Sequence, residues 1–422
     1  MNAFLKELQS RGLVSQMTNE QSIINQLNNG ATLYCGFDPT ADSLHVGSLL
    51  PLITLLRFKK AGHTVLPLIG GATGMIGDPS FKAVERTLND EKTVVSFKNA
   101  IVEQIKSIVG QDVKVVDNHD WTANMSVLEF LRDIGKHFSV NAMIAKDSVK
   151  SRIERPEQGI SFTEFSYQLL QGMDFWKLSQ LHNCTMQLGG SDQWGNIIAG
   201  IDLIHKKEGN DFVATGITMP LVTKSDGTKF GKTESGAVWL SAEKTSPFKF
   251  FQFWLGLSDV DTKKLFKLFS FKSVDEIDAI FKEDESRDKP LAQQILAEEM
   301  TMIVHGEAAL QSVLIMNKAL FGGDFDSLSE DDFINLEKEG VPVFTSSEKN
   351  IVELLVMTKL TESKRLARDL IKSGGISVNG VKTNAKTFED IQALSYSKTD
   401  LKHNKFLVLK RGRNKFIIIK SL

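Results

Sequence analysis

The stretch from Ala31 to Phe58 constrains the fold of this 422-residue chain more than any other. Residues 31–36 are mostly apolar and are followed by Pro39, which predicts a buried strand that ends in a loop. Apolar residues at 49, 50, 52, 53, 55 and 56 then predict a mostly buried helix over 49–58. A strand that leads through a polar turn into a helix is the opening unit of a parallel α/β sheet.

His45 and Gly47 stand at the first turn of this predicted helix. A helix start offers unpaired backbone N–H groups and the positive end of the helix dipole, which suits a phosphate. Gly47 lets a ligand approach the backbone, and His45 can donate a hydrogen bond to a phosphate oxygen. Taken alone, the pattern also fits a surface histidine near a helix cap.

Residues 64–69 form the next apolar run and lead into a glycine-rich loop that ends at Asp78-Pro79. Strand, helix, strand and glycine-rich loop predict a doubly wound, Rossmann-like parallel sheet with ligands at its carboxyl edge. The loop matches neither G-x-G-x-x-G nor a Walker sequence. Asp78 is placed to take an ammonium or hydroxyl group, or it belongs to an ordinary turn before proline. Lys82 and Arg86, four residues apart, are either an exposed basic face or a clamp on phosphates.

The chain continues with a predicted strand over 113–116 and a helix from Glu164 onward. Tyr167, Gln171 and Asp174 fall on one face of that helix, because they are separated by four and three residues. Such a polar stripe usually faces solvent. Apolar neighbours on the same helix make a lined pocket a second possibility.

A further strand over 185–188 ends in Gly-Gly-Ser-Asp-Gln-Trp-Gly-Asn and enters a helix near 196. This repeats the device of a glycine-rich turn before a helix and places Asp192 to bind a ribose hydroxyl. Lys229 and Lys232 then follow in a basic loop, three residues apart and next to Gly231. Two such point charges can reach one phosphate chain, although a lysine–glycine loop alone is unspecific.

Composition excludes several classes of protein. Hydrophobic residues make up 41% and charged residues 24%, as in ordinary globular proteins. No window holds about 18 uninterrupted apolar residues, so we expect no transmembrane helix. Two cysteines allow neither a disulfide framework nor a cysteine-rich zinc site. The first residues lack a signal-peptide core, so we expect a cytoplasmic protein.

The last 72 residues carry an unusual charge. Residues 351–422 hold 15 Lys and Arg against 6 Asp and Glu, a net charge of +9, whereas the whole chain has −2. Lys364, Arg368 and Lys372 share one face of a predicted helix. A hairpin with an Asn-Gly turn is predicted over 376–381, and a second hairpin with a basic tip over 406–419. A basic helix beside a small sheet is typical of an RNA-binding surface.

These segments, in this order, closely resemble the bacterial tyrosyl-tRNA synthetases, which are class I aminoacyl-tRNA synthetases. The matching motifs are Tyr-Cys-Gly-Phe-Asp-Pro-Thr, His-Val-Gly-Ser, Tyr167 with Gln171 and Asp174, Gly-Gly-Ser-Asp-Gln-Trp-Gly-Asn, Lys-Phe-Gly-Lys-Thr and an S4-like tail. Three positions depart from the usual class I pattern. Ser48 replaces a second histidine, Lys-Phe-Gly-Lys-Thr replaces Lys-Met-Ser-Lys-Ser, and Gly172 replaces an alanine.

The resemblance implies the reaction and its ligands. The chain would activate L-tyrosine with ATP and Mg²⁺, transfer it to tRNA(Tyr), and act as a homodimer without zinc or a membrane. The domains would be a Rossmann-like catalytic domain over 1–222, the lysine loop and an α-helical domain over 223–322, and an S4-like RNA-binding domain over 350–422. Residues 323–349 are rich in Asp, Ser and Glu and contain Pro342, and this composition predicts a weakly structured linker before the last domain.

The resemblance also implies a role for each matching residue. Tyr34 and Asp174 would bind the phenol of tyrosine, Tyr167, Gln171 and Asp78 its ammonium group, and Gln193 would lie near its carboxylate. ATP would be bound by Cys35, Gly36, Asp38, Thr40, His45, Gly47, Ser48, Gly190, Asp192 and Lys232, with Cys35 and Asp192 on the ribose. The phosphates in the transition state would be stabilised by Thr40, His45, Lys82, Arg86, Lys229, Lys232 and Thr233. The tRNA would be bound by Lys364, Arg365, Arg368, Lys372, Arg411 and Arg413.

Three alternatives stay open at the level of sequence. A tryptophanyl enzyme shares the signatures but does not need Tyr34 and Asp174 for a phenol. A small adenylyltransferase of the H-x-G-H type lacks the lysine loop and the basic tail. An RNA-binding protein descended from a synthetase should have lost His45, Lys229 or Lys232, all of which are present.

Overall fold

The computed structural model describes residues 2–78, 80, 90–153, 159–225, 227–233, 236–284, 291–339, 341–412 and 415–422. Contacts divide the chain into two compact units. The first comprises Met1–Thr245 and Phe253–Val304, and the second comprises Ser246–Gln252 and His305–Leu422. The division into four segments expected from the sequence is finer than this and stays a prediction, apart from the linker over 323–349, which is corrected below.

A six-stranded sheet lies at the centre of the first unit, in the order β1-β6-β5-β2-β3-β4. The strands from β2 to β6 pair in parallel, and β1 at the edge pairs antiparallel to β6. Their bounds are β1 Gln16–Met17, β2 Thr32–Phe37, β3 Thr64–Ile69, β4 Val116–Asp117, β5 Met186–Gly190 and β6 Thr215–Met219. The chain runs outward from β2 in both directions, so the crevice between β2 and β5 is the switch point of a doubly wound sheet. The predicted fold class is confirmed.

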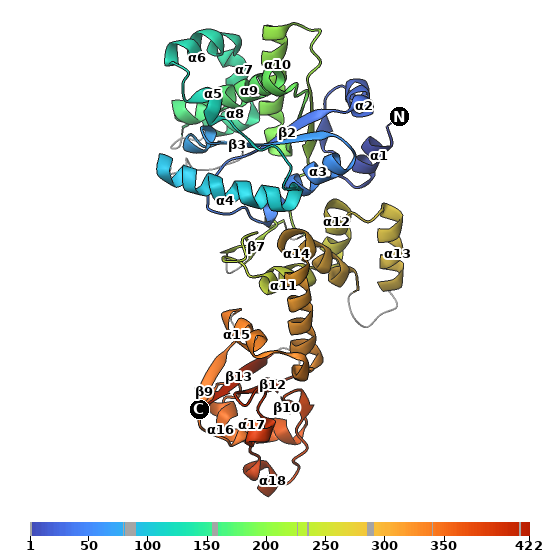
Figure 1. The fold of residues 1–422 in the computed structure, drawn as a ribbon, viewed down its shortest axis with the longest axis vertical. Helices are drawn as coiled ribbons and strands as arrows, with labels where there is room; N and C mark the ends of the chain where they lie inside the picture. Colours follow the sequence, from blue (N-terminus) through green and yellow to red (C-terminus); the bar gives the residue numbers. More distant parts are fainter. Residues whose placement is uncertain are drawn as a thin grey trace. The chain divides into compact units, whose positions relative to one another are not determined.

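Helices cover both faces of this sheet (Figure 1). On one face, α3 Leu49–Lys60 packs on β3 and on α4 Glu91–Val109. On the other, α10 Trp194–Glu208 packs on β5, β6 and α9 Phe162–His182. Ser161 caps the start of α9, and Asn183 ends it in the left-handed conformation with φ 51°. These caps fix where α9 begins and ends beside the sheet.

Shorter elements complete the first unit. They are α1 Ala3–Ser10, α2 Glu20–Asn29, η1 Val46–Ser48, η2 Thr73–Met75, α5 His119–Thr122, α6 Val127–Asp133, η3 Gly135–His137, α7 Val140–Ile144, α8 Asp147–Ile153, η4 Ser191–Gln193, β7 Lys232–Thr233, β8 Gly236–Ala237, α12 Asp259–Phe269 and α13 Val274–Asp284. Two helices, α11 Pro247–Leu255 and α14 Leu291–Gly322, contribute residues to both units.

The strand predicted over 113–116 does not form as expected. Only Val116 belongs to β4, which continues to Asp117. The backbone N–H of Val113 instead donates to Gly110 in a turn, 3.1 Å away. The apolar residues before β4 therefore lead into the strand without pairing in it.

The second unit contains a five-stranded sheet in the order β11-β10-β12-β13-β9. Its elements are η5 Phe325–Ser327, α15 Glu330–Lys338, β9 Val343–Ser346, α16 Ile351–Met357, α17 Lys364–Lys372, β10 Ile376–Val378, β11 Val381–Lys382, α18 Phe388–Ala393, η6 Lys398–Asp400, β12 Phe406–Arg411 and β13 Lys415–Ser421. Asn379 and Gly380 both have positive φ, 48° and 83°, in the turn between β10 and β11. This confirms the predicted Asn-Gly hairpin.

The prediction of a weakly structured linker over 323–349 is wrong. This segment forms η5, α15 and β9, and β9 pairs in parallel with β13. Phe333 is buried and stacks on Phe406 of β12 with ring centroids 4.8 Å apart. The many Asp, Ser and Glu residues are the exposed side of an amphipathic segment whose apolar side packs on the tail sheet.

No helix in the described ranges is both long and apolar enough to cross a lipid bilayer.

Candidate active site

A cavity of about 500 Å³ opens at the switch point of the first sheet, where β2 and β5 end. Its lining comes from β2, the loop before η1, η1, α9, and the turn between β5 and α10. Most residues predicted to bind tyrosine or ATP line it: Tyr34, Cys35, Gly36, Asp38, Thr40, His45, Gly47, Ser48, Asp78, Tyr167, Gln171, Asp174, Gly190, Asp192 and Gln193.

Asp174 and Tyr34 form one buried end of the cavity. The Asp174 carboxylate accepts hydrogen bonds from Asn118 Nδ2 at 2.9 Å and from Trp121 Nε1 at 2.8 Å. Burial raises the pKa of Asp174 to about 7, although both hydrogen bonds act to lower it. The Tyr34 hydroxyl is buried and has no hydrogen-bond partner among the described residues. Burial, and then the nearby Asp174 charge, hold the pKa of Tyr34 well above its usual value.

Sequence reasoning missed Asn118 and Trp121. The amide of Asn118 is fully engaged, because its oxygen accepts from Ala72 N–H at 2.8 Å and its nitrogen donates to both Thr73 and Asp174 at 2.9 Å. Asn118 directly follows β4, whose parallel neighbours also end at the cavity. A polar residue after a parallel strand was therefore the available signal.

Carboxylates and amides gather beside Tyr167. Its hydroxyl donates to Asp38 Oδ2 at 2.8 Å, and Asp38 also accepts from Thr73 at 2.8 Å. Gln193 Nε2 donates to Asp78 at 2.7 Å. The two carboxylates hold the pKa of Tyr167 well above its usual value, after the larger effect of burial. We expected Asp38 to bind ATP, but it accepts a hydrogen bond from Tyr167, a residue expected to bind the ammonium group of tyrosine.

His45 stands at the open side of the cavity, at the start of η1. Its Nδ1 accepts a hydrogen bond from the Gly47 N–H at 2.9 Å. In the neutral ring this leaves the proton on Nε2, as a donor. A side chain at Gly47 would approach His45 Cε1 to 2.6 Å, so the contact requires glycine. Ser48 makes no side-chain cap to α3, and its role stays a prediction.

The basic loop reaches this side of the cavity through its backbone. Gly231, with φ 84°, lies so close to η1 that its Cβ position is 3.4 Å from Gly47 N and from Val46. Val238 links the segments, because it donates to Gly231 O at 2.9 Å and accepts from Val46 N–H at 2.8 Å. Phe230 anchors the loop by packing among aromatic side chains, and the centroids of its ring and the Trp254 ring are 5.5 Å apart.

The remaining phosphate-binding candidates are less well placed. The Lys229 side chain is exposed and does not line the cavity. The backbone of Lys232 and Thr233 forms β7, and their side chains lie outside the described residues, as do Lys82 and Arg86. In the described part of the chain, no three His, Cys, Asp or Glu side chains gather to hold a metal ion.

In the tail, α17 presents an exposed basic face. Lys364, Arg365 and Lys372 are exposed, and the Arg368 guanidinium lies 5.0 Å from the centre of the Phe388 ring. Arg411 instead donates to the Leu360 carbonyl at 3.0 Å, so this side chain also serves the fold. Arg413 lies outside the described residues.

Comparisons with known proteins agree with this geometry. Residues 26–322 match the family model "tRNA synthetases class I (W and Y)". Residues 333–419 match the model "Tyrosine--tRNA ligase SYY-like C-terminal domain". The tyrosine–tRNA ligase of Aliivibrio fischeri is 50% identical, over 98% of this chain and 98% of that protein. That of Chromobacterium violaceum is 49% identical, over 99% of this chain and 98% of that protein.

Among solved structures, a C-terminally truncated mitochondrial tyrosyl-tRNA synthetase of Aspergillus nidulans has a TM-score of 0.68 and 28% identity. The match covers 76% of this chain and 95% of that one. A tryptophanyl-tRNA synthetase of Plasmodium falciparum, at 13% identity and TM-score 0.53, shares the fold alone. The chain therefore belongs to the class I tRNA synthetases and, within them, to the tyrosine–tRNA ligase family.

Proposed function

We propose that this family member activates L-tyrosine with ATP in the cavity at the switch point and transfers the tyrosyl group to tRNA(Tyr). The observation that carries the proposal is the buried Tyr34 hydroxyl, which lies beside Asp174 and has no hydrogen-bond partner among the residues that the structure describes. A buried polar atom without a partner costs free energy unless a ligand satisfies it. The phenol of tyrosine matches this need, since it can accept from Tyr34 and donate to Asp174.

Asp174 is well prepared for such a contact. Asn118 and Trp121 each donate to one of its oxygens, which holds the carboxylate in place and leaves lone pairs for the substrate. A phenylalanine ring would leave the Tyr34 hydroxyl unsatisfied, at a cost of about 1–3 kcal/mol, and would make no hydrogen bond to Asp174. The same pair therefore binds tyrosine and rejects phenylalanine.

The acidic residues beside Tyr167 suit the α-ammonium group of the substrate. We assign this group to Asp78, Tyr167 and Gln171, as the family resemblance implies. The Asp38 carboxylate, which accepts from Tyr167, adds a second negative charge on the same side. Gln193 donates to Asp78 and would lie near the substrate carboxylate.

No catalytic base is required for activation, because the substrate carboxylate is already a nucleophile. One carboxylate oxygen attacks the α-phosphorus of ATP, and the bond to the bridging oxygen of pyrophosphate breaks. His45 and Thr40 would stabilise the phosphates, Lys82, Arg86, Lys229, Lys232 and Thr233 would bind the departing pyrophosphate, and Cys35 and Asp192 would contact the ribose.

The metal-ligand chemistry of the described residues fits Mg²⁺ only as a companion of the nucleotide. They supply no group of three candidate ligands, so ATP phosphates would provide most of the coordination. Bound Mg²⁺ would neutralise charge on the phosphates. In the second step, the 3′-terminal ribose hydroxyl of the tRNA attacks the acyl carbon and AMP leaves.

The test is amino-acid-dependent ATP–pyrophosphate exchange with tyrosine, phenylalanine and tryptophan in parallel. Exchange with tyrosine alone would support the assignment of Tyr34 and Asp174. Exchange with tryptophan would reassign the cavity, since the matched family model covers both branches. Absence of exchange with all three would favour an RNA-binding protein on a synthetase scaffold.

We also propose a homodimer in the cytoplasm. Large apolar side chains are exposed on α6, on α7 and at the start of α9, including Leu128 at 79% and Phe162 at 76%. A second copy of the chain is an occupant that would cover such apolar surface. Sedimentation velocity should give a dimer for the wild type and a shift toward monomer for Phe162→Asp. A monomeric wild type would refute the homodimer.

A further inference from the structure

Asp261, in the first turn of α12, makes a long-range contact that a helix-capping sequence does not require. Ser258 and Asp261 stand three residues apart, as in a capping box, and Ser258 Oγ accepts from Asp261 N–H at 3.1 Å. In closed boxes of this chain, the acidic side chain accepts from the backbone N–H of the capping residue. Such boxes are Ser126 with Glu129, Ser329 with Asp332, and Ser397 with Asp400.

At α12 the carboxylate is used differently. Asp261 Oδ1 accepts from the backbone N–H of Ser225 at 2.8 Å, and Oδ2 accepts from Ser225 Oγ at 3.3 Å and Ser258 Oγ at 2.8 Å. Asp261 is only 8% exposed, whereas Ser225 lies at the surface, so the contact is partly buried. Its carboxylate therefore joins α12 to a segment 36 residues earlier in the chain.

Ser225 lies near the tip of a small hairpin that carries Lys229. Thr223 and Lys229 face each other in an antiparallel bridge, and Lys224 N–H donates to Thr228 O at 2.9 Å. At the base of the hairpin, Phe230 packs against Phe269, the last residue of α12, with ring centroids 5.7 Å apart. The two ends of α12 thus hold the tip and the base of the same hairpin.

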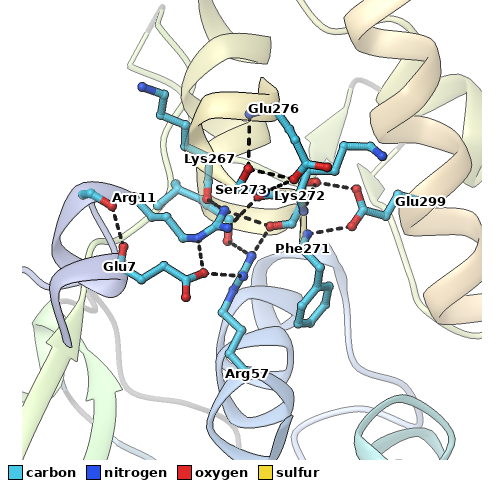
Figure 2. Close-up of polar contacts among 12 residues, drawn as sticks. Glu7, Arg11, Arg57, Lys267, Phe271, Lys272, Ser273, Glu276 and Glu299 are labelled. Atoms are coloured by element: carbon cyan, nitrogen blue, oxygen red, sulfur yellow. Dashed lines mark hydrogen bonds and ion pairs between the residues drawn. The ribbon is translucent and has the colours of Figure 1, made fainter. Parts of the chain in front are cut away.

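The C-terminal end of α12 is held by two arginines from the start of the chain, Arg11 and Arg57 (Figure 2). Arg11 donates to the carbonyls of Lys267 at 3.2 Å and Ser270 at 3.0 Å. Arg57 of α3 also donates to Ser270 O, and its guanidinium lies 4.5 Å from the Phe271 ring centre. Both arginines are buried, and positive charge at a helix C-terminus is stabilising. Because α3 follows η1, which begins next to His45, α12 connects the lysine hairpin to the helix that follows the His-Val-Gly-Ser motif.

We propose that Asp261 is a positioning residue for the adenylation reaction. Its carboxylate holds the hairpin over 222–230, so that Lys229 and the following Lys232 can reach the phosphates as pyrophosphate leaves. The inference rests on the proposed role of these lysines. If Asp261 only stabilised α12, its loss would lower the stability of the protein and leave the turnover of folded enzyme unchanged.

The experiment compares Asp261→Ala with Asp332→Ala, which removes the same type of residue from the closed box at α15. Tyrosine-dependent ATP–pyrophosphate exchange is measured on the full chain, and tyrosine binding is followed by tryptophan fluorescence. Asp261→Ala should lower kcat by roughly tenfold to 100-fold, because a displacement of about 1 Å can cost that much. The KM for tyrosine should change less than about twofold. Asp332→Ala should leave both constants unchanged.

A double-mutant cycle tests whether Asp261 acts through the lysine. In the Lys229→Ala background, Asp261→Ala should cost less than about threefold, since residues that act as a unit are not additive. Asp261→Asn, which keeps one acceptor for Ser225 N–H, should recover part of the loss and gives a second variant if the alanine protein folds poorly.

The outcomes separate the two hypotheses. Full activity of both Asp261 variants beside a slow Lys229→Ala enzyme would overturn the role of Asp261 alone. Losses that multiply in the double mutant would also overturn it. A fully active Lys229→Ala enzyme would overturn the proposed function of the lysine loop, and the inference about Asp261 with it.

Discussion

The buried carboxylate of Asp174 should make the free energy of unfolding of the first unit depend on pH, and Asp174→Asn should remove this dependence. Burial raises its pKa from 3.8 to about 7 in the folded protein. Between these values the folded state binds one proton more than the unfolded state. The stability that Asp174 contributes is therefore fully present below pH 3.8 and is lost as pH rises to about 7. The slope is about 1.4 kcal/mol per pH unit, which sums to about 4 kcal/mol.

Asp174→Asn removes this titration and introduces a pH-independent cost. Asn118 and Trp121 both donate to the carboxylate, whereas an amide offers them only one oxygen. One donor then faces the new NH₂ group, at about 1–3 kcal/mol. The free energy of unfolding of the variant, minus that of the wild type, should rise by roughly 2 kcal/mol from pH 5 to pH 7 and level off above pH 7.

Urea denaturation at pH 5, 6, 7 and 8 measures this difference. Tryptophan fluorescence reports the first unit selectively, because all five tryptophans belong to it: Trp121, Trp176, Trp194, Trp239 and Trp254. Asp112→Asn serves as the control, because the hydrogen bond from Lys59 holds the pKa of Asp112 below its usual value and this carboxyl stays ionised from pH 5 to pH 8. A stability difference for Asp174→Asn that does not change with pH would refute the argument from burial.

Three further predictions concern the cavity and the tail. Tyr34→Phe should reduce the preference for tyrosine over phenylalanine in pyrophosphate exchange by up to about tenfold, which is the contribution of one neutral hydrogen bond. If the ratio of the two exchange rates did not change, Tyr34 would not recognise the phenol. Gly47→Ala should displace the His45 ring and lower kcat by roughly tenfold or more, with tyrosine binding unchanged in equilibrium titrations; a normal kcat would contradict the role given to His45. Deletion of residues 323–422 should preserve pyrophosphate exchange and abolish tRNA charging, and efficient charging by this protein would exclude an RNA role for the tail. A protein that lacks only residues 350–422 should aggregate, because Phe333 loses its partner Phe406.

The parts of the fold that could be predicted are those whose signal is local. β3 occupies the predicted residues 64–69, because an apolar run between polar turns needs no tertiary information. The grouping of Tyr167, Gln171 and Asp174 in one cavity followed from helical spacing. What spacing leaves open is whether such a polar stripe faces water or a pocket, and the fold of the whole unit decides that.

The parts that escaped prediction depend on contacts between distant segments. Asn118 lies 56 residues from Asp174, and nothing near it in sequence marks it as a support for that carboxylate. The segment over 323–349 looked polar because its apolar residues are spaced for a surface that β12 and β13 provide. Asp38 was assigned from its motif, yet its hydrogen bonds run to Tyr167 and Thr73.

The near contact of Gly231 with Gly47 limits how this enzyme can be recombined with its relatives. A Cβ at position 231 would lie 3.4 Å from the backbone nitrogen of Gly47 and from the side chain of Val46, which is the limit of ordinary van der Waals contact. A chimaera that imports residues 222–240 from a donor without glycine at 231 would force a residue with a side chain into a positive φ, which such residues rarely adopt. The segments around Gly47 and Gly231 should therefore be replaced together in a chimaera, although the two glycines are 184 positions apart in the chain.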